Sequence, residues 1–307
     1  MHHTPVLKEE VLESLNLKKG AKVVDATLGL GGHSLEILKK IGDSGHLYAF
    51  EQDERNMEFA TERLKDFYDQ ITFFHTNFVS LKTCLESDGV TSVDAILFDL
   101  GLSSPHVDDP ERGFSFQQDG PLDMRFDRRN KLTAEEIINN WSESDLIEIF
   151  SRYGEERASK KVARTIVENR KKKPFKTTAD LAEFIRFQKK HIREKKDSAT
   201  NVFQALRIAV NDELTVLENV LPDAIDVLAP GGRLVVISYH SLEDRIVKNI
   251  LRDYSKDLED PNEPLINKVI RPKQIELITR KPITPSAEEV VGNPRARSAK
   301  MRVCERR

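Results

Sequence analysis

Three carboxylates each follow a short apolar run, and a glycine-dense turn follows one of them. Asp25, Glu51 and Asp99 stand directly after KVV, LYAF and AILF. The turn that follows Asp25 reads ATLGLGGHS, with glycine at three of four consecutive positions, Gly29, Gly31 and Gly32. Glycines allow a ligand to approach the backbone because no Cβ atom stands in the way. These residues predict a ligand site made of carboxylates and bare backbone.

The same residues favour S-adenosylmethionine over a dinucleotide. A carboxylate such as Glu51 suits a ribose diol, because two hydroxyl donors meet two acceptor oxygens. Asp25 beside the glycine turn would repel a pyrophosphate but would attract a positive aminoacyl-sulfonium group. The third glycine of G-x-G-x-x-G is also replaced, by Ser34. Asp53 has two interpretations, a second ribose contact or the N-cap of the next helix.

Candidate catalytic residues follow two of the apolar runs. Asp99 begins DLGLSSPH, so its carboxylate, with Ser103, Ser104 and Pro105 behind it, is expected to line a pocket for adenine and the substrate. Tyr239 and His240 lie in SYHSLEDR after a later run and are expected to face the pocket. His240 has a catalytic or a structural interpretation. The loop ERGFSFQQDGPLDMR places two phenylalanines, Phe114 and Phe116, where they either stack an RNA base or anchor the loop.

Alternating strand and helix patterns position these residues. Short apolar runs separated by helical patterns predict a parallel sheet covered on both faces. The expected strands are Ala21–Ala26, His46–Phe50, Ile71–His75, Val93–Phe98 and Arg233–Ser238, with Asn267–Arg271 and Lys300–Glu305 as the last strands of the sheet. The expected helices of this part are Val6–Leu15, His33–Lys40, Glu54–Phe67, Phe78–Glu86 and Leu242–Tyr254.

The alternation is interrupted after Asp99. A polar loop is expected from Gly101 to Arg129, followed by helices only from Thr133 to Lys196 and by one or two long helices over Asn201–Leu228. We therefore expect a doubly wound, mainly parallel α/β domain in two segments, 1–106 and 200–307. An inserted all-helical subdomain for substrate recognition is expected at 107–199.

Composition narrows the function classes. The chain has 307 residues and a net charge of −3, which excludes a uniformly basic nucleic-acid-binding coat. Three basic runs, Arg170–Lys173, Lys189–Lys196 and Arg295–Arg307, are candidates for phosphate contacts. Two distant cysteines predict neither a zinc site nor a disulfide framework, and we expect no metal. With no signal peptide and no apolar run of about 20 residues, we expect a cytoplasmic protein without membrane contact.

Five segments carry a resemblance to a known family. They read HHTPVLKEEVLESL from residue 2, DATLGLGGHS from 25, DLGLSSPHVDDPERGFSFQQDGPLDMR from 99, GGRLVVISYHSLEDRIVK from 231 and NPRARSAKMR from 293. In this order, over nearly the whole chain, they resemble the bacterial small-subunit (16S) ribosomal RNA cytidine N4-methyltransferases, the RsmH or MraW family. The long motifs are more specific than the glycine turn.

The resemblance implies a class I, Rossmann-like methyltransferase that uses S-adenosylmethionine to methylate a cytidine N4 in the decoding region. Carried over by position, the implied cofactor contacts are Gly31, Gly32, His33, Glu51, Phe78, Asp99 and His106. Glu51 stands where aspartate is usual, and His106 where glutamine is frequent. The alternatives are a non-catalytic RNA-binding or assembly factor and a nucleotide-dependent oxidoreductase. The general base, the RNA or assembled subunit as substrate, and a monomer or homodimer stay open.

Overall fold

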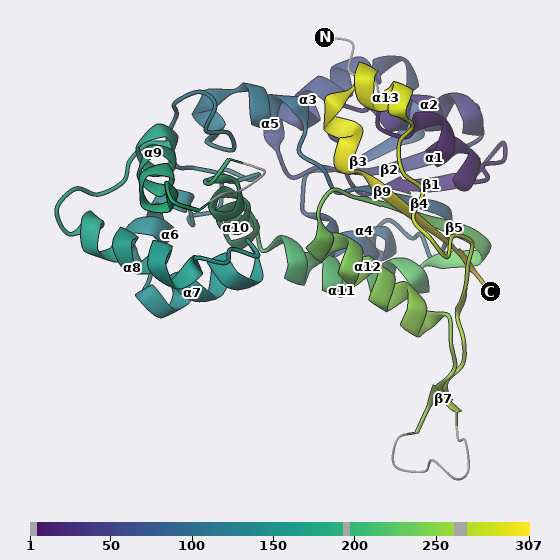
Figure 1. Ribbon diagram of the computed structural model, residues 1–307. Helices are drawn as coiled ribbons and strands as arrows, with labels where there is room; N and C mark the ends of the chain where they lie inside the picture. Colours follow the sequence, from purple (N-terminus) through teal and green to yellow (C-terminus); the bar gives the residue numbers. More distant parts are fainter. Residues whose placement is uncertain (1–4, 193–196, 261–268) are drawn as a thin grey trace. The chain divides into compact units, whose positions relative to one another are not determined.

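The chain folds into two compact units in the computed structural model, which describes residues 5–192, 197–260 and 269–307 (Figure 1). The first unit comprises Met1–Gly101 and Leu214–Arg307, and the second comprises Leu102–Glu213. A seven-stranded sheet forms the centre of the first unit, whereas the second unit is built from helices. None of the described helices is both long and apolar enough to cross a membrane.

The sheet of the first unit has the strand order β3-β2-β1-β4-β5-β9-β8. The first five strands in this order pair in parallel, and β9 pairs antiparallel with both β5 and β8. The strands are β1 (Lys22–Asp25), β2 (His46–Phe50), β3 (Ile71–Phe74), β4 (Val93–Asp99), β5 (Leu228–Ser238), β8 (Ile275–Leu277) and β9 (Lys300–Arg306). This topology confirms the predicted doubly wound, mainly parallel α/β class.

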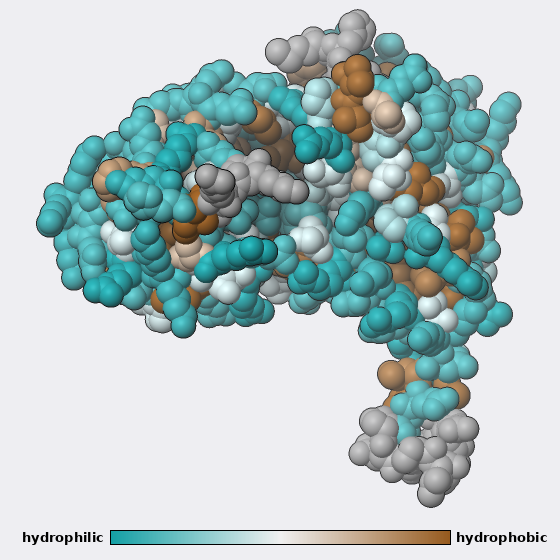
Figure 2. All heavy atoms as spheres, in the orientation of Figure 1, coloured by the Kyte–Doolittle hydropathy of each residue, from teal (hydrophilic) through white to brown (hydrophobic). Residues whose placement is uncertain are grey.

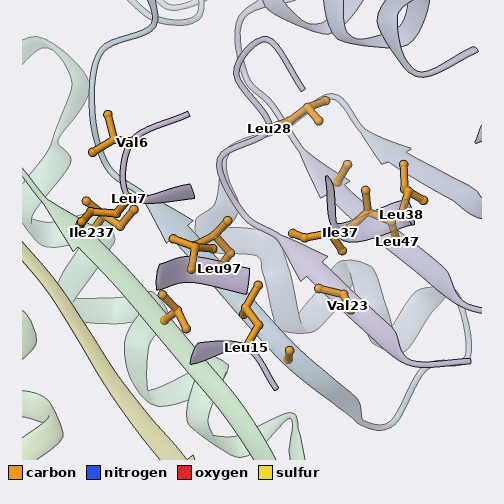
Figure 3. Close-up of a cluster of buried hydrophobic side chains, with 14 of the residues drawn as sticks. Val6, Leu7, Leu15, Val23, Leu28, Ile37, Leu38, Leu47, Leu97 and Ile237 are labelled. Atoms are coloured by element: carbon orange, nitrogen blue, oxygen red, sulfur yellow. The ribbon is translucent and has the colours of Figure 1, made fainter. Parts of the chain in front are cut away.

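Two apolar cores cover the two faces of the sheet. Neighbouring strand residues point to opposite faces, so Val23 and Leu97 enter one core while Val24 and Phe98 enter the other. Figure 3 shows part of the first core, where Val23 and Leu97 lie beside side chains from the adjacent helices. The first core is covered by α1 (Lys8–Ser14), α2 (Gly32–Ile41) and α3 (Glu54–Arg63), and the second by α4 (Leu81–Ser87), α11 (Glu213–Asp226) and α12 (Ser241–Tyr254).

Several expected elements differ from the observed ones. The helix expected over Glu54–Phe67 is α3, which ends at Arg63 and continues as a 3₁₀ helix, Lys65–Gln70. A second 3₁₀ helix, Phe78–Ser80, precedes α4. The final strand of the sheet is β8, which the sequence analysis missed because three residues are too few to show an alternation.

The strand expected at Asn267–Arg271 was assigned to the wrong sheet. Its described part, β7 (Val269–Arg271), pairs with β6 (Leu258–Glu259) in a separate two-stranded antiparallel sheet, and residues 267 and 268 lie outside the described residues. Leu258, Val269 and Ile270 are exposed there, and Figure 2 shows brown side chains on this part of the first unit. These strands therefore contribute no side chains to either core of the main sheet.

The second unit has an apolar core of its own. Its helices are α5 (Ser104–Asp108), α6 (Ala134–Asn140), α7 (Glu143–Arg152), α8 (Ser159–Arg170), α9 (Thr178–Lys189) and α10 (Thr200–Asn211), with a 3₁₀ turn at Pro110–Arg112. The expected insertion, 107–199, is narrower than this unit at both ends. Val202 and Leu206 of α10 are buried in the same core as Leu146 of α7, so α10 packs as part of the helical unit.

A buried ion pair ties the end of α9 to the connection between α7 and α8 in the second unit. Lys189 Nζ lies 2.6 Å from Glu156 Oε2, and both side chains are fully buried. Lys189 also donates to the Ser198 carbonyl at 3.0 Å. The basic run Lys189–Lys196 therefore does not begin with a phosphate-binding lysine, and its residues 193–196 lie outside the described part of the chain.

Removing one partner of this pair should destabilise the second unit. Lys189→Met leaves the Glu156 carboxylate buried without its cation, and we expect the free energy of unfolding to fall by about 3–5 kcal/mol. The double variant Glu156→Gln with Lys189→Met should recover most of this loss because it contains no unpaired charge. Urea unfolding measures both, with the exposed Lys190→Met as the control. A Lys189→Met loss no larger than the control would contradict the expectation.

Candidate active site

Three carboxylates meet at one edge of the sheet in the first unit. Asp25 and Asp99 are the last residues of β1 and β4, and Glu51 directly follows β2. These strands are neighbours in the sheet, in the order β2-β1-β4. After β1 the chain adds β2 and β3 on one side of this strand, and it then adds β4 and β5 on the other side. Open α/β sheets bind ligands at such a switch point, beyond the carboxyl ends of the strands.

Asp25 holds the glycine turn against the sheet. Its carboxylate is almost completely buried and accepts hydrogen bonds from Ser34 Oγ at 2.6 Å and from the Thr27 backbone N–H at 3.1 Å. Burial raises the pKa of the Asp25 carboxyl. Since Ser34 lies in α2, the carboxylate joins the end of β1 to the helix after the turn. Its contact with a sulfonium group stays a prediction.

Glu51 fastens the turn to the segment that follows β2. Its Oε2 accepts from the Gly29 N–H at 3.0 Å, and its Oε1 accepts from the Gln52 and Asp53 N–H groups at 2.9 and 2.8 Å. Burial raises the pKa of Glu51 to about 7. Asp53 is itself the N-cap of α3, accepting from the Arg55 N–H at 2.9 Å, so its capping interpretation is confirmed.

The three glycines of the turn differ in what surrounds them. Gly29 and Gly31 have φ of 51° and 72°, a region that L-residues rarely adopt. A Cβ on Gly29 would meet only the Thr27 carbonyl oxygen, at 3.8 Å. A Cβ on Gly31 would lie 3.2 Å from Leu64, and one on Gly32 would lie 2.8 Å from Pro5. Open space for a ligand therefore lies beside Gly29, while the protein itself fills the space at the other two.

Asp99 is held by residues from two other strand ends. Its N–H donates to Thr27 Oγ1 at 2.6 Å, and its Oδ1 accepts from the Tyr239 hydroxyl at 2.7 Å. Burial, followed by the Asp99 charge, raises the pKa of Tyr239 well above its usual value. A Cβ on Gly101 would lie 2.7 Å from the Tyr239 ring, so this glycine allows the ring to reach Asp99.

His33 faces the second oxygen of Asp99. Its Nε2 lies 3.6 Å from Asp99 Oδ2, and among the described residues this buried nitrogen has no hydrogen-bond partner. His33 follows Gly32 in the first turn of α2, so the glycine turn carries it to the strand ends. The structure thus brings seven of the predicted residues of the first unit to one edge, namely Asp25, Gly29, Gly31, Gly32, His33, Glu51 and Asp99.

Phe78 and His240 each have a packing or capping role in the first unit. The Phe78 ring meets Phe98 edge-on, with centroids 5.4 Å apart. His240 is the N-cap of α12 and accepts from the Glu243 N–H, while Glu243 accepts from the His240 N–H in return. A capping box of this kind is a structural device. The cofactor role of Phe78 and the catalytic role of His240 stay predictions.

Ser103, Ser104, Pro105 and His106 belong to the second unit. Ser103 is the N-cap of α5, and its Oγ lies 2.9 Å from His106 Nδ1. Ser104 is buried at the start of this helix, which the sequence analysis had expected to be loop. Proline at the next position suits a helix start because no N–H is needed there. The catalytic role of Ser103, Ser104 and Pro105 and the cofactor role of His106 stay predictions.

The two phenylalanines of the following loop anchor it to the second unit. Phe114 stacks on Phe126 with centroids 5.2 Å apart and lies 5.0 Å from the His106 ring. Phe116 meets Phe203 edge-on at 4.7 Å. Both pack against the core of the unit, which favours the anchoring interpretation over stacking with an RNA base.

The hydrogen bonds that hold the carboxylates were not predicted from the sequence, although Tyr239 was expected to face the pocket. Thr27, Ser34 and Tyr239 each bond to Asp25 or Asp99. A signal was available for Thr27, because an aspartate often bonds the backbone N–H two residues later. The position of Tyr239 after a predicted strand indicated the pocket, but no local signal indicated its bond to Asp99, which lies 140 residues away in sequence.

Solved structures resemble the whole chain only distantly. A predicted rRNA methylase from Clostridium thermocellum matches with 12% identity and a TM-score of 0.45, over 100% of both chains. An rRNA methylase from Streptococcus thermophilus matches with 12% identity and a TM-score of 0.44, over 100% of this chain and 98% of the other. A SAM-dependent O-methyltransferase from Thermotoga maritima matches with 12% identity and a TM-score of 0.43, over 99% and 67%. At these values the likenesses carry no argument about activity.

The family assignment comes from the sequence itself. The sequence model of the family described as the MraW methylase family matches residues 1–307, the whole chain. This match confirms the family predicted from the five motif segments and is inconsistent with an oxidoreductase. The chain therefore belongs to the MraW methylase family, and its cofactor is S-adenosylmethionine.

Proposed function

We propose that the protein methylates the N4 amine of a cytidine in the decoding region of small-subunit ribosomal RNA, with Asp99 at the reacting centre. The observation that carries the proposal is the Asp99 carboxylate, which ends β4 with one oxygen held by Tyr239 and the other directed at His33. A carboxylate fixed in this way can accept a hydrogen bond from an amine. We place the reaction in the cytoplasm, where ribosomal subunits are assembled.

The residues at this edge fit the cofactor. S-adenosylmethionine carries a positive aminoacyl-sulfonium group and a ribose diol. Asp25, Glu51 and Asp99 supply negative charge and acceptor oxygens at adjacent strand ends, and Gly29 leaves space beside the backbone. We assign Glu51 to the ribose, Asp25 to electrostatic support of the positive group, and Gly31, Gly32 and His33 to the turn that lies beneath the cofactor.

The substrate amine requires careful positioning. The cytosine N4 lone pair is delocalised into the ring, so N4 is a poor nucleophile, and S-adenosylmethionine supplies the methyl group when bound. We assign Asp99 the role of accepting a hydrogen bond from N4, which localises the lone pair on nitrogen and stabilises the positive charge that develops there. Tyr239 fixes the carboxylate for this contact, and the N4 proton leaves to Asp99 or to water.

A basic surface of the second unit fits an RNA partner. Residues 155–192 contain twelve lysines and arginines against five acids, although the whole chain has a net charge of −3. Figure 2 shows a largely hydrophilic face on this unit. On α9, Phe187 is 64% exposed and Lys190 Nζ lies 4.9 Å from its ring centroid. An exposed aromatic ring among cations suits base stacking beside phosphate contacts.

Three arginines of the basic runs are engaged within the protein itself and contribute less to this surface. Arg170 donates to the carbonyls of Ile138 and Trp141, so its guanidinium caps the C-terminal end of α6. In the C-terminal run, Arg302 pairs with Asp244 at 2.6 Å and Arg307 lies 3.3 Å from Glu276. We therefore assign RNA recognition to α8, the exposed lysines that follow it, and α9.

Mass spectrometry of the RNA tests the function directly. Small subunits or free ribosomal RNA from cells that lack the protein are incubated with the protein and S-adenosylmethionine. We expect a methyl group on the N4 of one cytidine in the decoding region. Methylation at another base or atom would contradict the proposed specificity, whereas binding without methylation would support the assembly-factor alternative.

Cofactor affinity should depend on pH through Glu51. Its pKa of about 7 means that the carboxylate, which accepts the two ribose hydroxyls, is mostly ionised at pH 8 but only about one-tenth ionised at pH 6. We expect binding at pH 6 to be roughly 5–10-fold weaker than at pH 8 by calorimetry. Glu51→Gln should bind S-adenosylmethionine weakly and with little pH dependence. If this variant instead shows the same pH dependence as the parent, Glu51 does not contact the ribose.

The same pKa shift has a consequence for stability. The folded-state pKa of Glu51 is raised from 4.5, so protonation favours the folded state. This contribution is fully present below pH 4.5 and is lost as the pH rises through 7. In the cofactor-free protein, the difference in unfolding free energy between parent and Glu51→Gln should therefore change over that window, as urea unfolding at several pH values would measure.

Asp99 should affect the chemical step. Asp99→Asn replaces the charged acceptor with an amide oxygen, and we expect the single-turnover rate at saturating cofactor to fall roughly 100-fold. Tyr239→Phe keeps the carboxylate but removes the hydroxyl that fixes its position, so we expect a smaller fall in this rate, of about 10-fold. The exposed Asp66→Asn serves as the control. A parental rate for Asp99→Asn would reduce Asp99 to a cofactor-binding residue.

Two exposed lysines should contribute to RNA affinity. Lys171 and Lys172 follow α8, and reversing both to Glu should weaken RNA binding and make its salt dependence shallower, because fewer counterions are released. Affinity for S-adenosylmethionine should not change. Lys18→Glu with Lys19→Glu, at exposed positions of the first unit, provides the charge-matched control. If RNA affinity stays parental at all salt concentrations, these lysines only interact with solvent.

A further inference from the structure

Leu7 has an unusual backbone conformation. Its φ and ψ are 53° and 37°, the left-handed region that is uncommon for residues other than glycine. The side chain is fully buried, and Figure 3 shows it close to Ile237 of β5. Such a conformation persists only where the surrounding structure holds it, and it often marks a functional part of a protein.

A glutamate near the other end of the chain holds this residue. The Leu7 N–H donates to Glu289 Oε1 at 2.7 Å, across 282 positions of sequence. Glu289 lies in α13 (Ala287–Gly292), and Ser286 caps this helix by accepting from the Glu289 N–H at 3.0 Å. Just before the helix, Ile283 pairs with β9. The turn at Leu7 is thus fastened to the sheet through the C-terminal segment.

The turn at Leu7 carries Pro5 to the glycine turn. A Cβ on Gly32 would lie only 2.8 Å from Pro5 Cγ, and 3.6 and 3.7 Å from two further ring atoms. Pro5 therefore occupies the space that a side chain on Gly32 would need. Gly32 opens α2 and is flanked by Gly31, its N-cap, and by His33, which faces Asp99.

We propose that Glu289 and Pro5 are positioning residues for S-adenosylmethionine. The hydrogen bond from Leu7 to Glu289 seats the Pro5 ring on Gly32, and this contact holds the glycine turn in the conformation that binds the cofactor. A turn fixed before binding loses less conformational entropy when the ligand arrives. The inference rests on the proposed cofactor role of the turn, and it explains Gly32 by contact with protein rather than with ligand.

The Glu289 contact can be tested without measuring catalysis. Glu289→Ala should increase hydrogen exchange at the Leu7 amide and weaken S-adenosylmethionine binding roughly 10-fold by calorimetry. The rate at saturating cofactor should stay near parental. Glu289→Gln retains an acceptor oxygen and should stay close to the parent. Glu288→Ala, at an exposed position in the same helical turn, is the matched control. Faster Leu7 exchange with parental affinity would overturn the positioning role.

A second pair of variants tests the Pro5 contact. Gly32→Ala adds the Cβ that meets the proline ring and should weaken cofactor binding roughly 10-fold through overpacking. Adding Pro5→Ala removes the ring atoms and should restore affinity to within about 3-fold of Pro5→Ala alone. If Gly32 instead serves direct contact with the ligand, the double variant will stay as weak as Gly32→Ala. That result would refute the Pro5 contact even if Glu289→Ala failed to fold.

Glu51→Gln separates failure of the inference from failure of the proposed site. If Glu51→Gln and the Gly32 and Glu289 variants all bind the cofactor like the parent, the site itself is assigned to the wrong edge. If Glu51→Gln weakens binding while the Glu289 and Pro5 variants show no effect, the site stands and the positioning inference fails.

Discussion

The buried carboxylate of Asp25 is the interaction on which the candidate site depends. It accepts hydrogen bonds from Ser34 Oγ and from the Thr27 N–H, and Thr27 Oγ1 in turn accepts from the Asp99 N–H. One aspartate thus fixes the start of α2, the turn after β1 and the end of β4. A buried carboxylate is unfavourable unless it is hydrogen-bonded, so these partners are energetically required. The same requirement places a glycine turn and a second carboxylate side by side.

The carboxylates at this edge differ in their surroundings. Both oxygens of Asp25 accept hydrogen bonds from residues of the turn and of α2, and these bonds fix the conformation of the turn. Glu51 spreads its oxygens over three backbone N–H groups, while burial brings its pKa to about 7. Asp99 is held through one oxygen by Tyr239. Residue type alone would have made the three equivalent, whereas their different partners underlie the different roles that we propose for them.

The second unit shows how a polar stretch acquires order. The sequence from Gly101 to Arg129 indicated a loop, yet Phe114 and Phe116 pack against the helical core, and Arg112 donates to the Arg125 and Phe126 carbonyls. Long loops usually lie on the surface because their backbone polar groups need partners. Here a buried guanidinium supplies such partners, so the part of the stretch that follows α5 and the 3₁₀ turn is fixed without regular secondary structure.

The sequence by itself determined the fold class, the family and the strand-end position of Asp25, Glu51 and Asp99. These features depend on local patterns, namely apolar runs, helical periodicity and motif segments that need no partner to be read. The sequence did not predict the three-residue strand β8 or the sheet to which β7 belongs, because short strands are defined by the strands with which they pair. Only the tertiary structure brought Tyr239 to Asp99, Lys189 to Glu156 and Pro5 to Gly32. Such contacts join distant parts of the chain, and their energy depends on burial and geometry, which exist only once the chain has folded.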